Sequence, residues 1–233
     1  MKSRVEMEAS VVSIFATDWQ RREGRVVPDS DSVRLGNDAV EIDATVLYAD
    51  LADSTGLVKG YKDWFAAEIY KAYLTVACDI IRNNGGVITA FDGDRVMAVY
   101  LGGSKNSSAA KSALQISWAM KDLINPKLKD RYPKTSYEVR QAVGIDTGRL
   151  MVAKAGIRGF NDLIWVGKAA NIAAKLSALR DGDYGSFITA AVYNSLNESS
   201  KTGGDPKRSM WKEHLWAETG EVVMKSNWQW RPA

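Results

Sequence analysis

ATVLYADLADST, residues 44–55, is the stretch that decides the fold predicted for the rest of the chain. Its apolar and β-branched residues at 45–48 predict a strand that ends at Asp50. Asp53, Ser54 and Thr55 follow, and their side-chain oxygens are of the kind that caps a helix N-terminus. The stretch therefore predicts a strand with a carboxylate at its end, followed by a turn into a helix.

A second stretch, residues 90–100 (AFDGDRVMAVY), predicts a β-hairpin. Asp92-Gly93 stands between two strand-like runs, which is a strong short-range hairpin signal. If this hairpin neighbours the first strand, Asp50 and Asp94 lie at the same end of one sheet. Paired carboxylates with few other protein ligands suit Mg²⁺ when substrate phosphates complete its coordination shell.

Length and charge indicate an ordinary globular protein. The chain has 233 residues, enough for one large domain with an appended segment, and we assign residues 1–42 to an N-terminal helix and connector and 43–233 to the main domain. Lysine and arginine number 31 against 28 acidic residues, so the net charge is only +3. With no dense basic run either, we expect no nucleic-acid partner.

Cysteine and histidine usage excludes several kinds of site. Cys78 is the only cysteine, so neither an internal disulfide nor a multi-cysteine zinc site is possible, and we expect a reducing compartment, most simply the cytoplasm. His214 is the only histidine, which argues against Ser-His-Asp chemistry. The N-terminus is too charged for a signal peptide and no apolar run approaches a membrane span, so we expect no membrane association.

The order of predicted elements indicates an α+β fold. Helical spacing over 62–84 ends at Gly85-Gly86, and a second helix over 107–124 is predicted to end before Pro126. Further predictions are a strand over 137–145 that breaks at 146–148, strands at 150–153, 163–166 and 187–189, a helix over 168–180, and a mobile polar loop at 199–206. Strand, helix, hairpin, helix, strand is the order of a ferredoxin-like core, in which helices cover one face of an antiparallel-rich sheet. The other face is left for a ligand or a partner subunit.

Four motifs in this order resemble the class III nucleotidyl cyclases, the family of adenylate and guanylate cyclase catalytic domains. They are residues 48–55 (YADLADST), 93–99 (GDRVMAV), 143–148 (VGIDTG) and 166–176 (VGKAANIAAKL). Each motif alone is weak, but the four together, in the family's order and spacing, make a strong match over about residues 43–230.

The resemblance implies a homodimer with active sites at the subunit interface and a nucleoside triphosphate as substrate. By analogy Asp50, Asp94 and the backbone carbonyl of Leu51 would hold two divalent cations, Mg²⁺ or Mn²⁺. The partner would contribute Asn171 to position the ribose and Lys175 to meet charge on the α-phosphate.

The resemblance also implies a triphosphate site. Backbone amides around residues 53–56 would cradle the phosphates, and Lys225 matches the family's late phosphate-binding lysine. The residues expected at the substrate's phosphates are therefore Asp53, Ser54, Thr55, Gly56 and Lys225.

Departures from the family's pattern indicate an unusual base. The positions that read the purine hold Ala90 and Ile164, and neither side chain can hydrogen-bond a purine edge. Tyr48 lies two residues before Asp50 on the same strand and must point to the same side, where with Trp165 it would narrow the site. Lys175 stands where the family usually has arginine, and lysine lacks the bidentate fork.

This combination resembles the bacterial pyrimidine cyclases of antiphage signalling, which make cyclic UMP or cyclic CMP and act through a separate cyclic-nucleotide-responsive effector. The implied reaction is conversion of UTP, or CTP, to the 3′,5′-cyclic monophosphate and pyrophosphate. Two alternatives stay open at this point. One is a catalytically idle cyclase homologue that serves as a binding module, and the other is an ATP or GTP cyclase with atypical base contacts.

Overall fold

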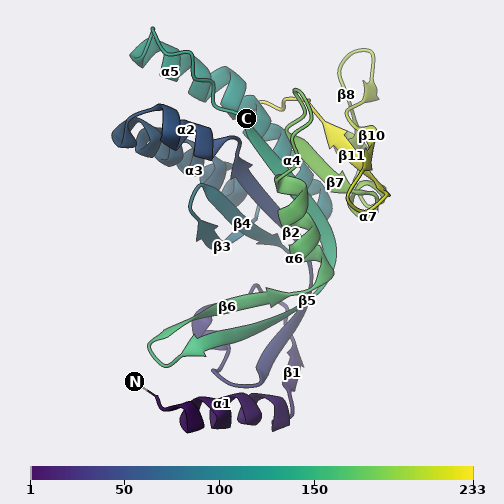
Figure 1. The fold of residues 1–233 in the computed structure, drawn as a ribbon. Helices are drawn as coiled ribbons and strands as arrows, with labels where there is room; N and C mark the ends of the chain where they lie inside the picture. Colours follow the sequence, from purple (N-terminus) through teal and green to yellow (C-terminus); the bar gives the residue numbers. More distant parts are fainter. Residues whose placement is uncertain (1, 233) are drawn as a thin grey trace.

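Two long neighbouring strands, β2 (Asp38–Leu51) and β5 (Gln141–Ile157), form the centre of the computed structural model, which describes residues 2–232 (Figure 1). They belong to one mainly antiparallel sheet with the strand order β10-β11-β7-β5-β2-β4-β3. The other strands of this path are β3 (Val87–Asp92), β4 (Arg95–Tyr100), β7 (Ser186–Thr189), β10 (Lys212–Trp216) and β11 (Glu221–Ser226). The predicted hairpin is confirmed as β3 and β4, with Gly93-Asp94 in its turn.

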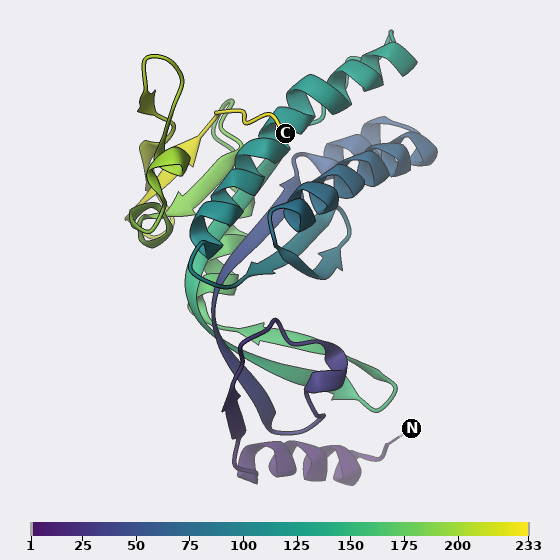
Figure 2. The same cartoon turned by 180° about the vertical axis from the view of Figure 1, so that it is seen from behind.

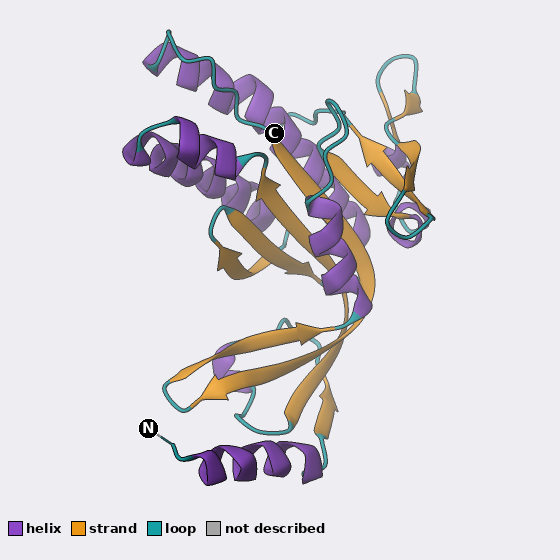
Figure 3. Ribbon diagram, viewed as in Figure 1, coloured by secondary structure: helices purple, strands orange, loops and turns teal. Residues whose placement is uncertain are grey.

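The outer parts of β2 and β5 extend away from the helices and form a separate arm of the sheet (Figures 1 and 3). There β1 (Gln20–Glu23) pairs with the first residues of β2, and β6 (Phe160–Val166) pairs with the last residues of β5. The predicted N-terminal helix is α1 (Arg4–Ala16), which runs across the end of this arm. None of its residues is buried. A short 3₁₀ turn, η1 (Ser30–Ser32), lies between β1 and β2.

The predicted break at residues 146–148 is wrong, because β5 passes through them without interruption. The polar side chains that suggested a break have partners inside the fold. Asp146 is only 4% exposed and accepts a hydrogen bond of 2.6 Å from the Thr189 hydroxyl, while the Thr147 hydroxyl donates to the Ala44 carbonyl. Buried polar groups that are hydrogen-bonded do not end a strand.

One face of the sheet is covered by the helices that precede β5 (Figure 2). These are α2 (Ser54–Gly60), α3 (Asp63–Asn83), α4 (Lys105–Ala119) and α5 (Asn125–Arg131), the last two joined by a π-helical turn, η2 (Met120–Ile124). The main core forms here, with Leu47 and Leu51 of β2 against side chains such as Tyr73 of α3. The predicted helix end before Pro126 is wrong, because the helical backbone continues from η2 into α5, and Pro126 lies in the first turn of α5 directly after the π-helical turn.

The opposite face carries α6 (Lys168–Ser177), so the expectation that helices cover only one face is wrong. Small side chains on α6 allow close packing on the sheet, with Ala169 and Ala173 in a cluster with Val46 of β2. The closest approach is at Gly144 of β5, where an added Cβ would lie 2.1 Å from the Ala173 carbonyl oxygen. This contact fixes the position of α6 over the centre of the sheet.

The C-terminal part is more regular than predicted. The expected mobile loop at 199–206 overlaps α8 (Glu198–Lys201) and β8 (Thr202–Gly203), which pairs with β9 (Arg208–Ser209). Trp211 is buried and its indole N–H donates to the Ser200 carbonyl, which holds this segment on the core. A short helix, α7 (Ala190–Asn194), follows β7. Within residues 2–232, no helix is both long and apolar enough to cross a bilayer.

Substitution of Gly144 by alanine tests the contact that seats α6. We expect Gly144→Ala to lower the free energy of unfolding by about 1–3 kcal/mol, since the obstructing atoms belong to the α6 backbone and cannot rotate away. Urea denaturation measures the change. Gly103→Ala is the matched control, because nothing lies within 4 Å of its added Cβ. Equal stability of the two variants would contradict this packing.

Substitution of Asp146 by asparagine tests the buried acid. Burial raises the pKa of Asp146, against the lowering effect of its hydrogen bonds from Thr189 and the Thr147 backbone. A raised pKa means that the folded protein holds the proton more tightly than the unfolded chain does. The stability that this group contributes is therefore lost as the pH rises from the pKa of Asp146 in the unfolded chain, about 3.9, through its higher pKa in the folded protein.

We expect the free energy of unfolding of Asp146→Asn, relative to that of the wild type, to increase across that pH interval. Above the interval the difference should stay constant up to pH 7. Urea denaturation of both proteins at a series of pH values measures it. Parallel stability curves would show that the pKa of Asp146 is the same in the folded and unfolded chain.

Candidate active site

Asp50 and Asp94 lie next to each other at one edge of the sheet. Strand pairing places Asp50, the penultimate residue of β2, directly opposite Arg95, the first residue of β4. Asp94 precedes Arg95 in the hairpin turn. Burial raises the pKa of the Tyr73 hydroxyl on α3, and the charges of Asp50 and Asp94 raise it further.

The donor set at this edge fits a hard divalent cation. One carboxylate oxygen of Asp94, Oδ2, is buried and has no hydrogen-bond partner among the described residues, and neither has the Tyr73 hydroxyl. A buried carboxylate oxygen without a donor is costly unless a cation or another ligand satisfies it. Leu51, whose carbonyl is the third expected ligand, ends β2 beside Asp50. Within residues 2–232 no cluster of three or more Asp, Glu, His and Cys side chains forms a metal site, so any cation here relies on few carboxylates.

An arginine that the sequence motifs did not predict contacts Asp50. The Arg180 guanidinium Nη2 donates to Asp50 Oδ2 at 3.0 Å. Burial raises the pKa of Asp50, the Arg180 hydrogen bond lowers it, and the neighbouring Asp94 charge raises it again. Arg180 lies in the connection between α6 and β7, far from Asp50 in sequence, and no local pattern marked it.

The turn from β2 into α2 has an unusual backbone at Asp53. This residue is the N-cap of α2 and adopts the left-handed conformation, with φ of 58°. Its carboxylate accepts a hydrogen bond from the Gly56 amide at 3.3 Å, and a Cβ on Gly56 would collide with that carboxylate. Ser54 and Thr55 form the first turn between them. The four predicted phosphate-contacting residues of this segment therefore form one compact turn beside Asp50.

A cavity of about 350 Å³ opens beside this turn. Asp53, Arg140 and Arg180 line it together with Asp181 and with neighbouring backbone. The predicted phosphate-binding residue Lys225 lies at the same place, because its ammonium group contacts Asp181 at 2.5 Å and stands 4.1 Å from the centre of the Tyr184 ring, which also lines the cavity. Of the residues predicted for the triphosphate, Asp53 therefore lines the cavity, and Lys225 contacts two of its lining residues, Asp181 and Tyr184.

Tyr48 and Ala90 lie on the sheet face that carries α6. Both pack against the cluster that contains Ala169 and Ala173, and Trp165 packs there too. The Arg95 guanidinium lies 5.4 Å from the centre of the Tyr48 ring, a cation–π contact that the sequence did not predict. Ile164 is not part of this wall, since it is 42% exposed on β6, where Leu163 and Trp165 take the inward positions.

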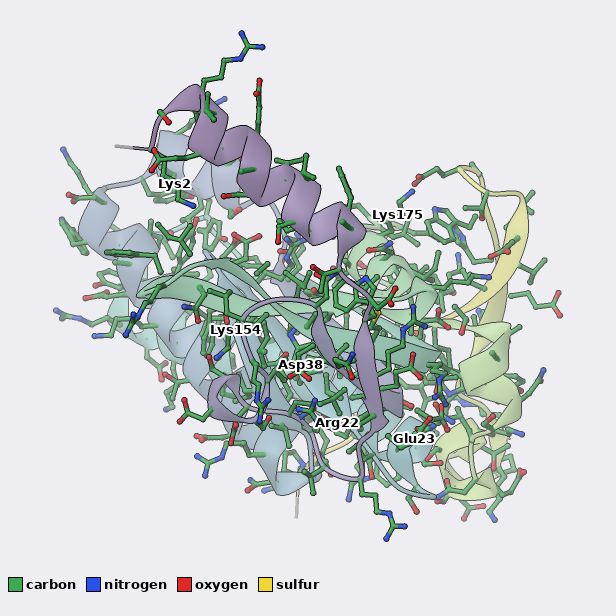
Figure 4. All side chains as sticks on the ribbon, turned by 90° about the horizontal axis from the view of Figure 1, so that it is seen from below. Lys2, Arg22, Glu23, Asp38, Lys154 and Lys175 are labelled. Atoms are coloured by element: carbon green, nitrogen blue, oxygen red, sulfur yellow. The ribbon has the colours of Figure 1, made fainter. Side chains whose placement is uncertain are left out.

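Asn171 and Lys175 point to solvent from α6. Both residues are exposed, and Figure 4 labels Lys175. Lys175 forms an ion pair with Glu218, which lies between β10 and β11. Among the hydrogen bonds and ion pairs of residues 2–232, none joins either side chain to Asp50 or Asp94. One subunit therefore does not bring the two predicted catalytic side chains together with the two acids.

Comparisons with known proteins agree on one family. No family model matches the chain. It is 49% identical over 220 residues to a uridylate cyclase of Xanthomonas perforans, with 94% of each chain covered, and 44% identical over 227 residues to a uridylate cyclase of Burkholderia cepacia, with 97% of each covered. Among solved structures it resembles the adenylyl cyclase CyaB from P. aeruginosa, with a TM-score of 0.66 and 19% identity over 81% of this chain and 94% of that one. The guanylyl cyclase Cya2 matches with a TM-score of 0.65 and 16% identity over 80% and 91%.

Substitution of each turn acid tests the cation site. We expect Asp94→Ala to weaken Mn²⁺ binding at least about tenfold, because it removes one of only two carboxylates at the site. Asp92→Ala is the matched control. Asp92 lies two residues earlier in the same turn, is largely exposed and pairs with Arg95 instead. Isothermal titration with Mn²⁺ measures both, and equal losses in the two variants would show that Asp94 has no special role.

Proposed function

The chain belongs to the uridylate cyclases, nucleotidyl cyclases with the class III fold, and on that premise we propose that it converts UTP into 3′,5′-cyclic UMP and pyrophosphate. The observation that carries the proposal is the 49% identity to a uridylate cyclase over 94% of the chain. The site geometry supports it, because Asp50 and Asp94 lie together at one end of β2 and β4, a cavity of about 350 Å³ lies beside the turn that follows β2, and Tyr48 packs on the sheet face beside Asp50.

We propose that Asp50, Asp94 and the Leu51 carbonyl hold two Mg²⁺ or Mn²⁺ ions. Such ions, when bound, would activate the ribose hydroxyl and neutralise charge on the leaving group. The backbone of residues 53–56 and the Lys225 ammonium group would bind the triphosphate. Lys225 is already held beside the cavity by Asp181, whose pKa its hydrogen bond lowers.

The reaction is an intramolecular displacement at the α-phosphorus. The 3′-oxygen of the ribose forms a bond to this phosphorus and loses its proton to solvent. The bond from the α-phosphorus to the bridging oxygen breaks, and its electron pair leaves with pyrophosphate. Asn171 would orient the ribose, and Lys175 would face the negative charge that grows on the α-phosphate oxygens.

A pyrimidine base suits the wall beside Asp50 better than a purine does. Tyr48 and the Arg95 guanidinium stacked on it occupy space on the sheet face beside the acids. Ala90, which packs on the same face as Tyr48, offers no hydrogen-bonding group to a base. A purine would leave its polar edge unpaired there, which costs affinity. We favour UTP over CTP because the relatives that share most of this chain's length are named uridylate cyclases.

We propose that the active enzyme is a homodimer with two shared sites. Asn171 and Lys175 are exposed and have no contact with the acids of their own subunit within the described chain. A partner subunit would supply them. Exposed apolar side chains on the β5–β6 hairpin support an interface, namely Ile157, Phe160, Ile164 and Val166. By the resemblance to pyrimidine cyclases, the product would serve as a second messenger in antiphage defence and act on a separate effector.

An assay with the four nucleoside triphosphates and Mn²⁺ tests the reaction. We expect pyrophosphate release with UTP, a product with the mass of cyclic UMP, and no activity in Asp50→Ala, because that variant lacks a cation ligand. An idle binding module would release no pyrophosphate from any nucleotide. A purine cyclase would turn over ATP or GTP. Full activity of Asp50→Ala would contradict the proposed role of Asp50 as a cation ligand.

A further inference from the structure

Arg180 is held at the junction of the cation site and the triphosphate cavity. It lies three residues beyond the end of α6, and its Nη1 donates to the carbonyl oxygens of Ser177 and Leu179, both at 2.9 Å. These bonds fix one side of the guanidinium against the backbone. On the other side, Nη2 donates to Asp50 Oδ2.

The cavity beside Arg180 has the charge that an anion requires. Arg140 and Arg180 both line it. Of the two acidic residues that line it, Asp181 forms an ion pair with Lys225 at 2.5 Å and lies 3.0 Å from His214 Nδ1. Asp53 caps α2 and directs its carboxylate at the Gly56 amide. The side chain of Arg180 is 43% exposed, so a ligand in the cavity can reach it.

Cation binding at Asp50 removes the present partner of Arg180. A divalent cation beside Asp50 takes up its carboxylate oxygens and repels a guanidinium at 3.0 Å. The oxygens of a bound triphosphate are then the nearest strong acceptors, and arginine binds phosphate through two parallel hydrogen bonds. Arg180 lines the cavity, so a rotation of its guanidinium away from Asp50 would direct Nη2 at a phosphate bound there.

The helix position that normally carries an arginine in class III cyclases holds Lys175 here. Lysine is a point charge without the planar fork, and in this structure its ammonium group pairs with Glu218 on the surface. Arg180, which contacts Asp50 of the same chain, would supply a planar guanidinium that Lys175 does not.

We propose that Arg180 contacts the triphosphate of UTP from the same subunit that supplies Asp50 and Asp94, and so replaces the guanidinium that α6 lacks. This inference rests on the proposed function, since it concerns the same site. It differs from a merely structural role of Arg180, in which the ion pair only holds Asp50 in place when no cation is bound.

Binding of a substrate that cannot cyclise separates these roles. 3′-Deoxy-UTP with Mn²⁺, titrated calorimetrically, should bind about 10- to 100-fold more weakly to Arg180→Gln than to the wild type, because a charge-assisted hydrogen bond is lost. Arg180→Lys should recover part of that affinity. Arg82→Gln, at the exposed end of α3, is the matched control and should leave the affinity unchanged. Thermal unfolding identifies any variant that fails to fold.

The sign of the change decides between the roles. If Arg180 only holds Asp50, its removal frees the carboxylate for the cation, and the affinity for 3′-deoxy-UTP with Mn²⁺ rises or stays constant. Either result overturns the proposal. If the wild-type chain binds 3′-deoxy-UTP but cyclises no nucleotide, only the proposed function is contradicted. The Arg180 contact is tested separately, by the affinity for 3′-deoxy-UTP. A wild-type chain that binds no triphosphate would overturn both.

Co-expression of two inactive variants tests whether Arg180 acts within its own subunit. A dimer of Asp50→Ala and Asn171→Ala chains retains one intact shared site, so activity should return. A dimer of Asp50→Ala and Arg180→Gln chains should stay inactive, since the site with an intact Asp50 lacks its own Arg180. Restored activity in the second pair would assign Arg180 to the partner's site and overturn the proposal. If the first pair stays inactive, the sites are not shared, and the affinity of Arg180→Gln for 3′-deoxy-UTP decides.

Discussion

The pairing of Asp50 with Arg95 across β2 and β4 is the constraint on which the candidate site depends. It brings together two acids that are far apart in the sequence, and a carboxylate oxygen of Asp94 is buried there without a donor from residues 2–232. Everything else at the site is placed relative to this pair. The Asp53 turn follows directly from β2, and the cavity with Arg180 and Lys225 opens beside it.

The sheet distributes the remaining groups by the alternation of β2. Leu47 and Leu51 face the main core under the helices, while Val46 and Tyr48 face α6. Because Leu47 and Leu51 are buried in the main core, Val46 and Tyr48 must lie on the opposite face of the sheet. The same alternation aligns Tyr48 and Asp50, so the base wall and the cation ligands are positioned by a single strand.

The parts of the structure that follow from local patterns were predictable from the sequence. The β3–β4 hairpin forms where Asp92-Gly93 predicted it, with Gly93-Asp94 as its turn, and α3 has helical spacing with glycines after its end. The errors came from long-range contacts. β5 continues through Asp146 because Thr189 donates to it from another strand, and nothing near residue 146 encodes that bond. Arg180 was missed for the same reason, since its contact with Asp50 joins a loop to a distant strand end. Assignment of Lys225 needed the family motif, and the structure places it beside Tyr184 and Asp181.

The paired length of β2 also limits how such a chain can change in evolution. β2 is bonded on both sides over most of its length, to β5 on one edge and to β4 or β1 on the other. One residue gained or lost inside β2 would move every side chain beyond that point to the other face of the sheet. Asp50 would then point toward the face that α2 to α5 cover. A change of length in the turn between β5 and β6 would leave this alternation intact, because that turn lies outside β2. The residue count of β2 is therefore constrained by the site in a way that the length of this turn is not.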